Sequence, residues 1–193
     1  MNRIPTLLAS AVLLLAGTGR MEAERYLTLA EAQKLCFPQA DQFTAQTNSF
    51  TTEHLKSIEH QSGVKVPNAP CRYWLARQGT NLLGVLVLDQ VFGKHELIDY
   101  AVAIAPDGRV LQVELLEYRE NYGGEIRGEK WRAQFRGKTA AAPLKLTGDI
   151  YNISGATISC RHVTEGVKRV LTTFELVIKP KLSGTAGQPV PAP

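Results

Sequence analysis

The 193-residue chain lacks the sequence features that mark several classes of protein. It has no block of lysine and arginine with interleaved aromatic residues, and its formal net charge is only +4, so no nucleic-acid partner is expected. Its three cysteines form neither a C-x-x-C nor a C-x-x-C-H motif, which argues against a thioredoxin-type disulfide and a c-type haem. The four histidines lack the spacing of metal ligands, and no acid–base constellation of catalytic residues or internal repeat is present.

The N-terminus predicts export. Arg3 precedes an apolar run over residues 4–16, and small residues follow, which is typical of a Sec-type signal peptide over 1–23. A buried helix and an uncleaved membrane anchor are the alternatives. We therefore expect an exported, periplasmic protein with or without an association with the membrane. In that compartment Cys36 and Cys71 could form a disulfide that leaves Cys160 over, although the sequence does not determine the pairing.

Residues 24–80 are expected to form an N-terminal helical extension. Thr28 with Glu31 makes a capping box for one short helix, and a second is expected from about Thr52, with Gly63 as its stop signal. From residue 72 the pattern changes to β-branched and aromatic runs separated by turns, including the tight turn Pro106-Asp107-Gly108.

The C-terminal part predicts a long helix and then a tail. Apolar residues recur at helical spacing from Val163 to Val177. Residues 179–193 are rich in glycine and proline and are expected to be disordered. These elements predict a single α+β domain with a small, mostly antiparallel sheet and flanking helices.

The segment SGATIS, residues 154–159, lies just ahead of that helix. Gly155 permits a positive φ and close approach of a ligand, Thr157 presents a hydroxyl at the helix mouth, and Ser159 is a plausible N-cap. Free N–H groups at a helix start bind phosphate well. Chemistry alone leaves two interpretations open, an anion site and a simple helix cap.

This segment resembles the flavinylation motif of the FMN-binding domain family, which includes exported flavin subunits of Rnf and sodium-pumping NADH:quinone oxidoreductase complexes. The upstream stretch YRENYGGEIRGEKWRAQFRGK resembles a second family motif. The matching residues there are Glu120, Tyr122, Gly123, Gly124, Trp131, Phe135, Gly137 and Lys138. The resemblance spans residues 82–177 and implies an FMN-binding domain over 81–178.

The resemblance implies that a flavin transferase attaches FMN through its phosphate to Thr157. The expected cofactor-binding residues are Thr157, Ser154, Gly155, Ala156, Ile158, Ser159, Glu120, Tyr122, Gly123 and Gly124. The family usually has Asp three residues before the motif serine, where this chain has Tyr151.

The implied function is electron transfer in a respiratory or extracytoplasmic redox chain, with redox partner proteins in solution or in a membrane complex. The protein would then be an electron carrier rather than a stand-alone enzyme, because a carrier only has to hold the flavin near a partner and tune its potential. Three alternatives remain open: a flavin-dependent reductase, a redox sensor or assembly module that binds FMN without a covalent bond, and a binding domain without flavin.

Overall fold

The computed structural model describes residues 27–120 and 123–184. It contains one five-stranded antiparallel sheet in the order β1-β2-β3-β4-β5. The strands are β1 Gln42–Asn48, β2 Cys71–Gln78, β3 Asn81–Phe92, β4 Leu97–Ile104 and β5 Val110–Tyr118. The expected signal peptide, Tyr122 and residues 185–193 lie outside the described residues. The sheet with its flanking helices confirms the expected α+β fold in a single domain.

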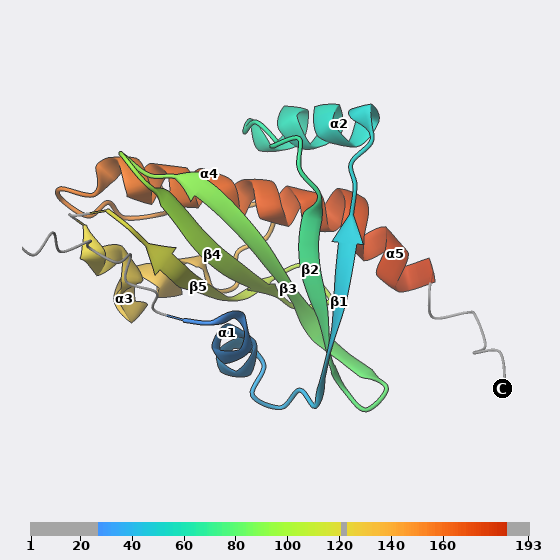
Figure 1. Cartoon of the computed structure of the whole chain (residues 1–193). Coiled ribbons are helices and arrows are strands. Elements are labelled where there is room, and N and C mark those ends of the chain that lie inside the picture. Colours follow the sequence, from blue (N-terminus) through green and yellow to red (C-terminus); the bar gives the residue numbers. More distant parts are fainter. Residues whose placement is uncertain (1–26, 121–122, 185–193) are drawn as a thin grey trace, which may run out of the picture.

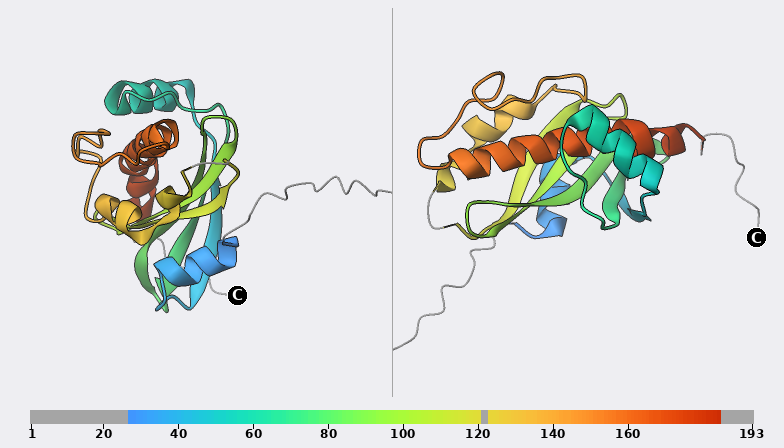
Figure 2. Two further views of the ribbon diagram at one scale, coloured as in Figure 1. Left: turned by 90° about the vertical axis from the view of Figure 1, so that its left-hand side faces the viewer. Right: turned by 90° about the horizontal axis from the view of Figure 1, so that it is seen from above.

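Helices cover both faces of the sheet (Figures 1 and 2). The helices are α1 Leu29–Cys36, α2 Thr52–Ser62, α3 Glu129–Arg132, α4 Thr157–Thr173 and α5 Lys179–Gly184, with short turns η1 Gly124–Arg127 and η2 Ala133–Phe135 and a π-helical stretch Phe174–Ile178 that joins α4 to α5. Helix α1 lies on one face and α4 runs along the other, while α2 packs on α4.

Two hydrophobic clusters follow from this layering. The larger one joins the apolar stripe of α4, including Val163 and Val167, to inward residues of β3 and β4 such as Val85 and Val102. The smaller one lies under α1 and includes Phe37 and Leu86. Strand β4 is buried along almost its whole length because it has a helix layer on each side.

The helix starts and turns expected from local sequence are present. Thr28 and Glu31 form the capping box of α1, Thr51 caps α2, and Gly63 ends α2 with φ +71°. The turn between β4 and β5 is closed by a hydrogen bond from the Gly108 N–H to the Ala105 carbonyl, 2.9 Å. These features depend on a few adjacent residues, and so the local pattern was sufficient to predict them.

The structure differs from the sequence-based prediction at both ends of the domain. Residues 24–80 are not only a helical extension, because β1 and β2 lie within that range and belong to the same sheet as β3. Residues 179–184 form helix α5 rather than the start of a disordered tail. The assigned domain boundaries otherwise stay predictions.

The disulfide between Cys36 and Cys71 that the sequence left open is not formed, and all three cysteines are free. Cys36 belongs to the cluster under α1, whereas Cys71 packs against the cluster under α4, so the sheet separates them. Burial raises the pKa of each of these two thiols to about 12, so both stay protonated.

Within residues 27–120 and 123–184, no helix is both long and apolar enough to cross a membrane. The described part of the chain also holds no cluster of three or more His, Cys, Asp or Glu residues arranged to bind a metal ion.

Candidate functional site

Helix α4 begins at Thr157, directly after the turn of the SGATIS segment. Gly155 has φ +82°, and the Ala156 N–H donates to the Ile153 carbonyl at 3.1 Å, which closes the turn. Ala156 is the N-cap residue, so no side chain accepts a hydrogen bond from the first turn. The expected N-cap role of Ser159 is therefore wrong. Ser159 lies inside the first turn and is buried.

The Thr157 side chain is exposed and held in place by a neighbour. The Asn152 Nδ2 group donates to Thr157 Oγ1 at 2.9 Å. Because the hydroxyl oxygen accepts this bond, its own proton remains free to point elsewhere. Ser154, Gly155 and Ile158 are also exposed, while Ala156 is buried. In this segment the Thr157 side chain is thus exposed to solvent, whereas the Ala156 side chain packs in the core.

Backbone hydrogen bonds fix the chain that leads into the motif. The Trp131 indole N–H donates to the Tyr151 carbonyl at 2.8 Å, and the Tyr151 N–H donates to Gln134 Oε1 at 2.6 Å. Gln134 in turn donates to the Trp131 carbonyl at 3.0 Å. Trp131, one of the residues that carried the resemblance, therefore positions the chain that leads into the SGATIS segment from a different part of the sequence.

The two sequence motifs meet at Gly123. Its φ is +82°, and a Cβ added there would lie 2.4 Å from the Ala156 Cβ and 2.9 Å from the Tyr118 hydroxyl. Only glycine combines this backbone conformation with so close a contact. In this structure Gly123 thus allows the Gly-rich segment, which begins with Gly123 and Gly124, to pack on the start of α4. Its expected contact with FMN stays a prediction, as does that of Gly124.

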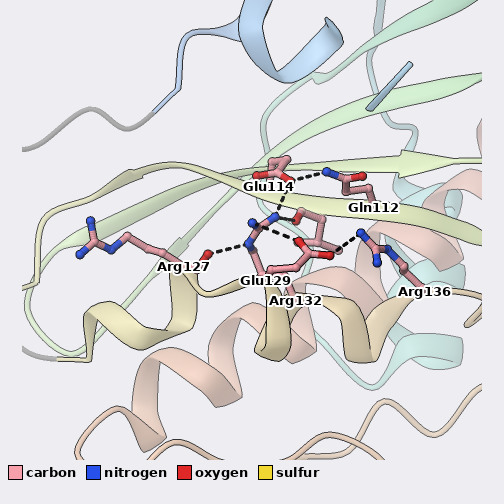
Figure 3. A network of polar contacts seen from close by, with 7 residues as sticks. Gln112, Glu114, Arg127, Glu129, Arg132 and Arg136 are labelled. Carbon is pink, nitrogen blue, oxygen red and sulfur yellow. Dashed lines mark hydrogen bonds and ion pairs between the residues drawn. The ribbon is translucent and has the colours of Figure 1, made fainter. Parts of the chain in front are cut away.

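An ion-pair network ties the Gly-rich segment to the sheet (Figure 3). Arg132 contacts Glu114 of β5, donates to the Val113 carbonyl at 2.7 Å and donates through Nε to the Arg127 carbonyl at 2.8 Å. Arg127 then donates to the Gly124 carbonyl at 3.0 Å. Glu129 contributes ion pairs to Arg132 and Arg136. Since Arg132 is largely buried, the network holds the Gly-rich segment in one place relative to β5.

Glu120 binds the β3–β4 hairpin in this structure. Its Oε1 accepts the backbone N–H groups of His95 at 2.6 Å and Glu96 at 3.1 Å. The same hairpin reaches α4 through Phe92, whose carbonyl lies 2.5 Å from His162 Nδ1. Glu120 therefore aligns a loop beside the helix start. A direct contact of Glu120 with FMN stays a prediction, and Tyr122 lies outside the described residues.

Tyr118 links the end of β5 to the motif helix. Burial raises the pKa of Tyr118, and a hydrogen bond with Ser159 opposes that rise. The phenol therefore stays neutral at physiological pH and acts as a packing and hydrogen-bonding group. Ser159, expected as a cofactor contact, is engaged beneath the surface instead of facing outward.

The sequence analysis did not identify some residues of the site. Asn152 and Gln134 carried no motif signal, because each acts through a contact that joins residues at least five positions apart. Tyr151 is 77% exposed, and Asp149, the nearest acid, is committed to Lys138 and to backbone N–H groups. Asp149 therefore does not take the place of the Asp that the family usually has at position 151.

The arrangement fits a phosphate-bearing cofactor. The first turn of α4 has no side-chain cap and no acidic residue, and Arg161 is exposed one turn further along. A helix start of this kind stabilises negative charge through its N–H groups and dipole. Thr157 would hold the phosphate group, and FMN would supply the redox chemistry.

Comparisons with known proteins bear on the family that the motifs resemble. Residues 93–172 match the family model described as the FMN-binding domain. Over these residues the match confirms the resemblance drawn from the motifs. The family binds FMN, so the expected cofactor is confirmed as well.

One relative and one solved structure extend the comparison. Over 112 residues the chain is 30% identical to a subunit of the proton-translocating ferredoxin:NAD(+) oxidoreductase complex of Clostridium ljungdahlii, covering 53% of this chain and 60% of the relative. The chain thus spans less than two thirds of the length of this relative. The fold is similar to that of NqrC from Shewanella oneidensis, with a TM-score of 0.53, 15% identity, and coverage of 78% of this chain and 88% of that one.

Proposed function

We propose that this protein is an exported electron carrier of Rnf-like and Nqr-like redox complexes, with FMN attached through its phosphate to Thr157. The observation that carries the proposal is the exposed Thr157 hydroxyl at a helix start without a side-chain cap, inside the segment that matches the FMN-binding domain. The name of the Clostridium relative, which describes part of a ferredoxin:NAD(+) oxidoreductase complex, supports a place in an electron-transfer assembly.

The attachment is a transfer of FMN from FAD by a separate flavin transferase. The bond that forms joins Thr157 Oγ1 to the FMN phosphorus, and the bond that breaks is the pyrophosphate linkage of FAD. AMP leaves, and the hydroxyl proton passes to the transferase or to water. In this step the protein presents the hydroxyl, with Asn152 orienting its oxygen. Covalent attachment also suits an exported protein, because a dissociated cofactor would be lost outside the cytoplasm.

Exposed apolar side chains near the site support a role in contacting a redox partner. Phe92 is 57% exposed, Tyr151 77% and Ile158 41%, and all three lie by the first turns of α4 or the segment that leads into it. Aromatic side chains such as Phe92 and Tyr151 are enriched at protein interfaces. A partner that docks here would approach the flavin on Thr157 closely.

The decisive test is the intact mass of the exported protein co-expressed with a flavin transferase. We expect the wild type to gain one FMN less a water and Thr157→Val to gain nothing, because valine has the shape of threonine without the hydroxyl. Thr157→Ser keeps a hydroxyl and should be modified at least in part. A wild-type protein without added mass, or a fully modified Thr157→Val, would contradict the covalent linkage.

A second candidate is an FMN protein without the covalent bond. It is favoured by the single observation that Tyr151 stands where the family usually has Asp. If it holds, the purified protein contains FMN that acid precipitation releases, and Tyr151→Asp converts the protein to the covalent form. Flavin that stays with the precipitated wild-type protein contradicts this candidate.

A further inference from the structure

The SGATIS segment carries three hydroxyl groups in different surroundings. Ser159 is buried and hydrogen-bonds with Tyr118 beneath the surface. Ser154 and Thr157 are both exposed, but in the part of the chain that the structure describes only the Thr157 hydroxyl of these two has a hydrogen-bond partner, the Asn152 amide at 2.9 Å. Thr157 is therefore the exposed hydroxyl of this segment whose oxygen is held in a defined position.

The backbone on both sides of Asn152 is fixed by hydrogen bonds. On the N-terminal side, the Tyr151 carbonyl accepts the Trp131 indole N–H at 2.8 Å. On the C-terminal side, the Ile153 carbonyl accepts the Ala156 N–H at 3.1 Å and closes the turn. The Asn152 amide therefore reaches the first residue of α4 from a segment that is itself held in place, and so the position of the amide is well defined.

Two effects of this hydrogen bond favour reaction at the Thr157 oxygen. The first is entropic, because a threonine in a helix divides its time between χ1 rotamers and the amide holds the oxygen in one of them. The second is electrostatic. Since Asn152 Nδ2 donates, it stabilises the negative charge that develops on Oγ1 as the hydroxyl loses its proton. The hydroxyl oxygen has a second lone pair, which stays available to attack phosphorus.

We propose that Asn152 is a positioning residue that raises the rate at which a flavin transferase attaches FMN to Thr157. This inference rests on the proposed function and adds to it a residue that controls how fast the flavin-loaded protein forms. In the transfer, Thr157 Oγ1 forms a bond to the phosphorus of the FMN half of FAD while its O–H bond breaks. The pyrophosphate P–O bond breaks as well, AMP leaves with the electrons of that bond, and the transferase or water takes the proton.

The test is a time course of intact mass for the flavin-free protein incubated with FAD and a flavin transferase. We expect Asn152→Ala to lower kcat of the transfer about fivefold, the effect of losing one neutral hydrogen bond, and to leave KM for the protein unchanged. Asn152→Leu keeps the approximate size of the side chain without a donor and should lose as much. Urea denaturation of each variant should give the wild-type free energy of unfolding, because the bond lies at the surface.

Asn81→Ala is the matched control. Asn81 is an exposed asparagine at the first residue of β3, whereas the last residue of that strand, Phe92, is the one that contacts α4. The control should be modified at the wild-type rate. An unchanged kcat for Asn152→Ala, or a loss confined to KM, overturns the role of Asn152 while the proposed function stands. A wild-type protein that gains no FMN mass overturns both.

Discussion

Gly123 and Gly155 have the same φ, +82°, but different surroundings. A Cβ on Gly123 would collide with Ala156, whereas nothing lies within 4 Å of a Cβ on Gly155. Glycine is therefore favoured at Gly155 by its backbone conformation alone, and at Gly123 by both its backbone conformation and a close contact.

We predict that Gly123→Ala destabilises the fold more than Gly155→Ala does. Both variants carry the backbone cost of about 1 kcal/mol, and only Gly123→Ala adds overpacking of about 1–3 kcal/mol. Urea denaturation of the flavin-free protein measures both free energies of unfolding. Equal losses of unfolding free energy in the two variants would show that Gly123 and Ala156 are not in close contact.

Asp149 is a second residue whose contribution can be isolated. Burial opposes ionisation of its carboxyl, but the ion pair with Lys138 and the N–H groups of Lys145 and Leu144 outweigh that effect and hold the pKa of Asp149 below its ordinary value. Since the folded-state pKa is depressed, the stabilisation is complete above the unfolded value of about 4 and is lost as the pH falls through the folded value.

We predict that Asp149→Asn costs about 2 kcal/mol near neutral pH, in the range of charged hydrogen bonds. The difference between the variant and the wild type should shrink as the pH drops below about 4, since protonation removes the same interactions from the wild type. Free energies of unfolding between pH 7 and pH 3 measure this. A difference that does not change with pH would contradict the role of the ionised carboxylate.

At the scale of elements, α4 is attached to the sheet by charge as well as by apolar packing. Arg169 of α4 pairs with Asp89 of β3 at 2.6 Å, and the Tyr100 hydroxyl donates to the same carboxylate. Burial is the main cause of the raised pKa of Tyr100, so the phenol stays protonated as a donor. The helix that carries Thr157 is thereby aligned on the central strands.

We predict that Arg169→Met destabilises the protein by about 3–5 kcal/mol, because it leaves Asp89 charged and nearly buried. Arg109→Met is the control, since Arg109 pairs with Asp107 at the surface, where water and salt screen the attraction. Chemical denaturation distinguishes the two. A loss for Arg169→Met as small as that of the control would mean that the pair stabilises α4 little.

On the scale of the whole molecule, the domain extends well before the segment that matches the family model. Strand β2 pairs with β3 from Arg72↔Leu88 to Gln78↔Asn81, and α2 packs on α4. The match to the FMN-binding domain begins only at residue 93. The first two strands are thus part of the same sheet without belonging to the matched segment.

We predict that a chain of residues 81–184 does not fold, whereas residues 27–184 do. The shorter chain exposes the edge of β3 and the α4 surface that α2 covers. Circular dichroism and resistance to limited proteolysis measure the difference. A cooperative unfolding transition for the shorter chain would show that β1 and β2 are dispensable.

The sequence predicted the site at the level of motifs but not of contacts. Thr157 at a helix start and the Gly-rich segment were recognisable, because each depends on a few adjacent residue types. Three contacts were not recognisable, because each joins residues twenty or more positions apart. Gly123 packs against Ala156, the Trp131 indole donates to the Tyr151 carbonyl, and the Glu120 carboxylate accepts N–H groups of the β3–β4 hairpin.

The sequence by itself determined the fold class and most of the helix and strand positions, because periodicity, capping residues and turn residues act locally. Its two motifs also carried the resemblance to the FMN-binding domain family. Only the tertiary structure decided that β1 and β2 complete the sheet, that Cys36 and Cys71 lie on opposite faces, and that the Trp131 indole holds the backbone ahead of Thr157. Strand pairing and side-chain clusters depend on which distant segments pack together. That choice minimises the free energy of the whole chain rather than of any one stretch.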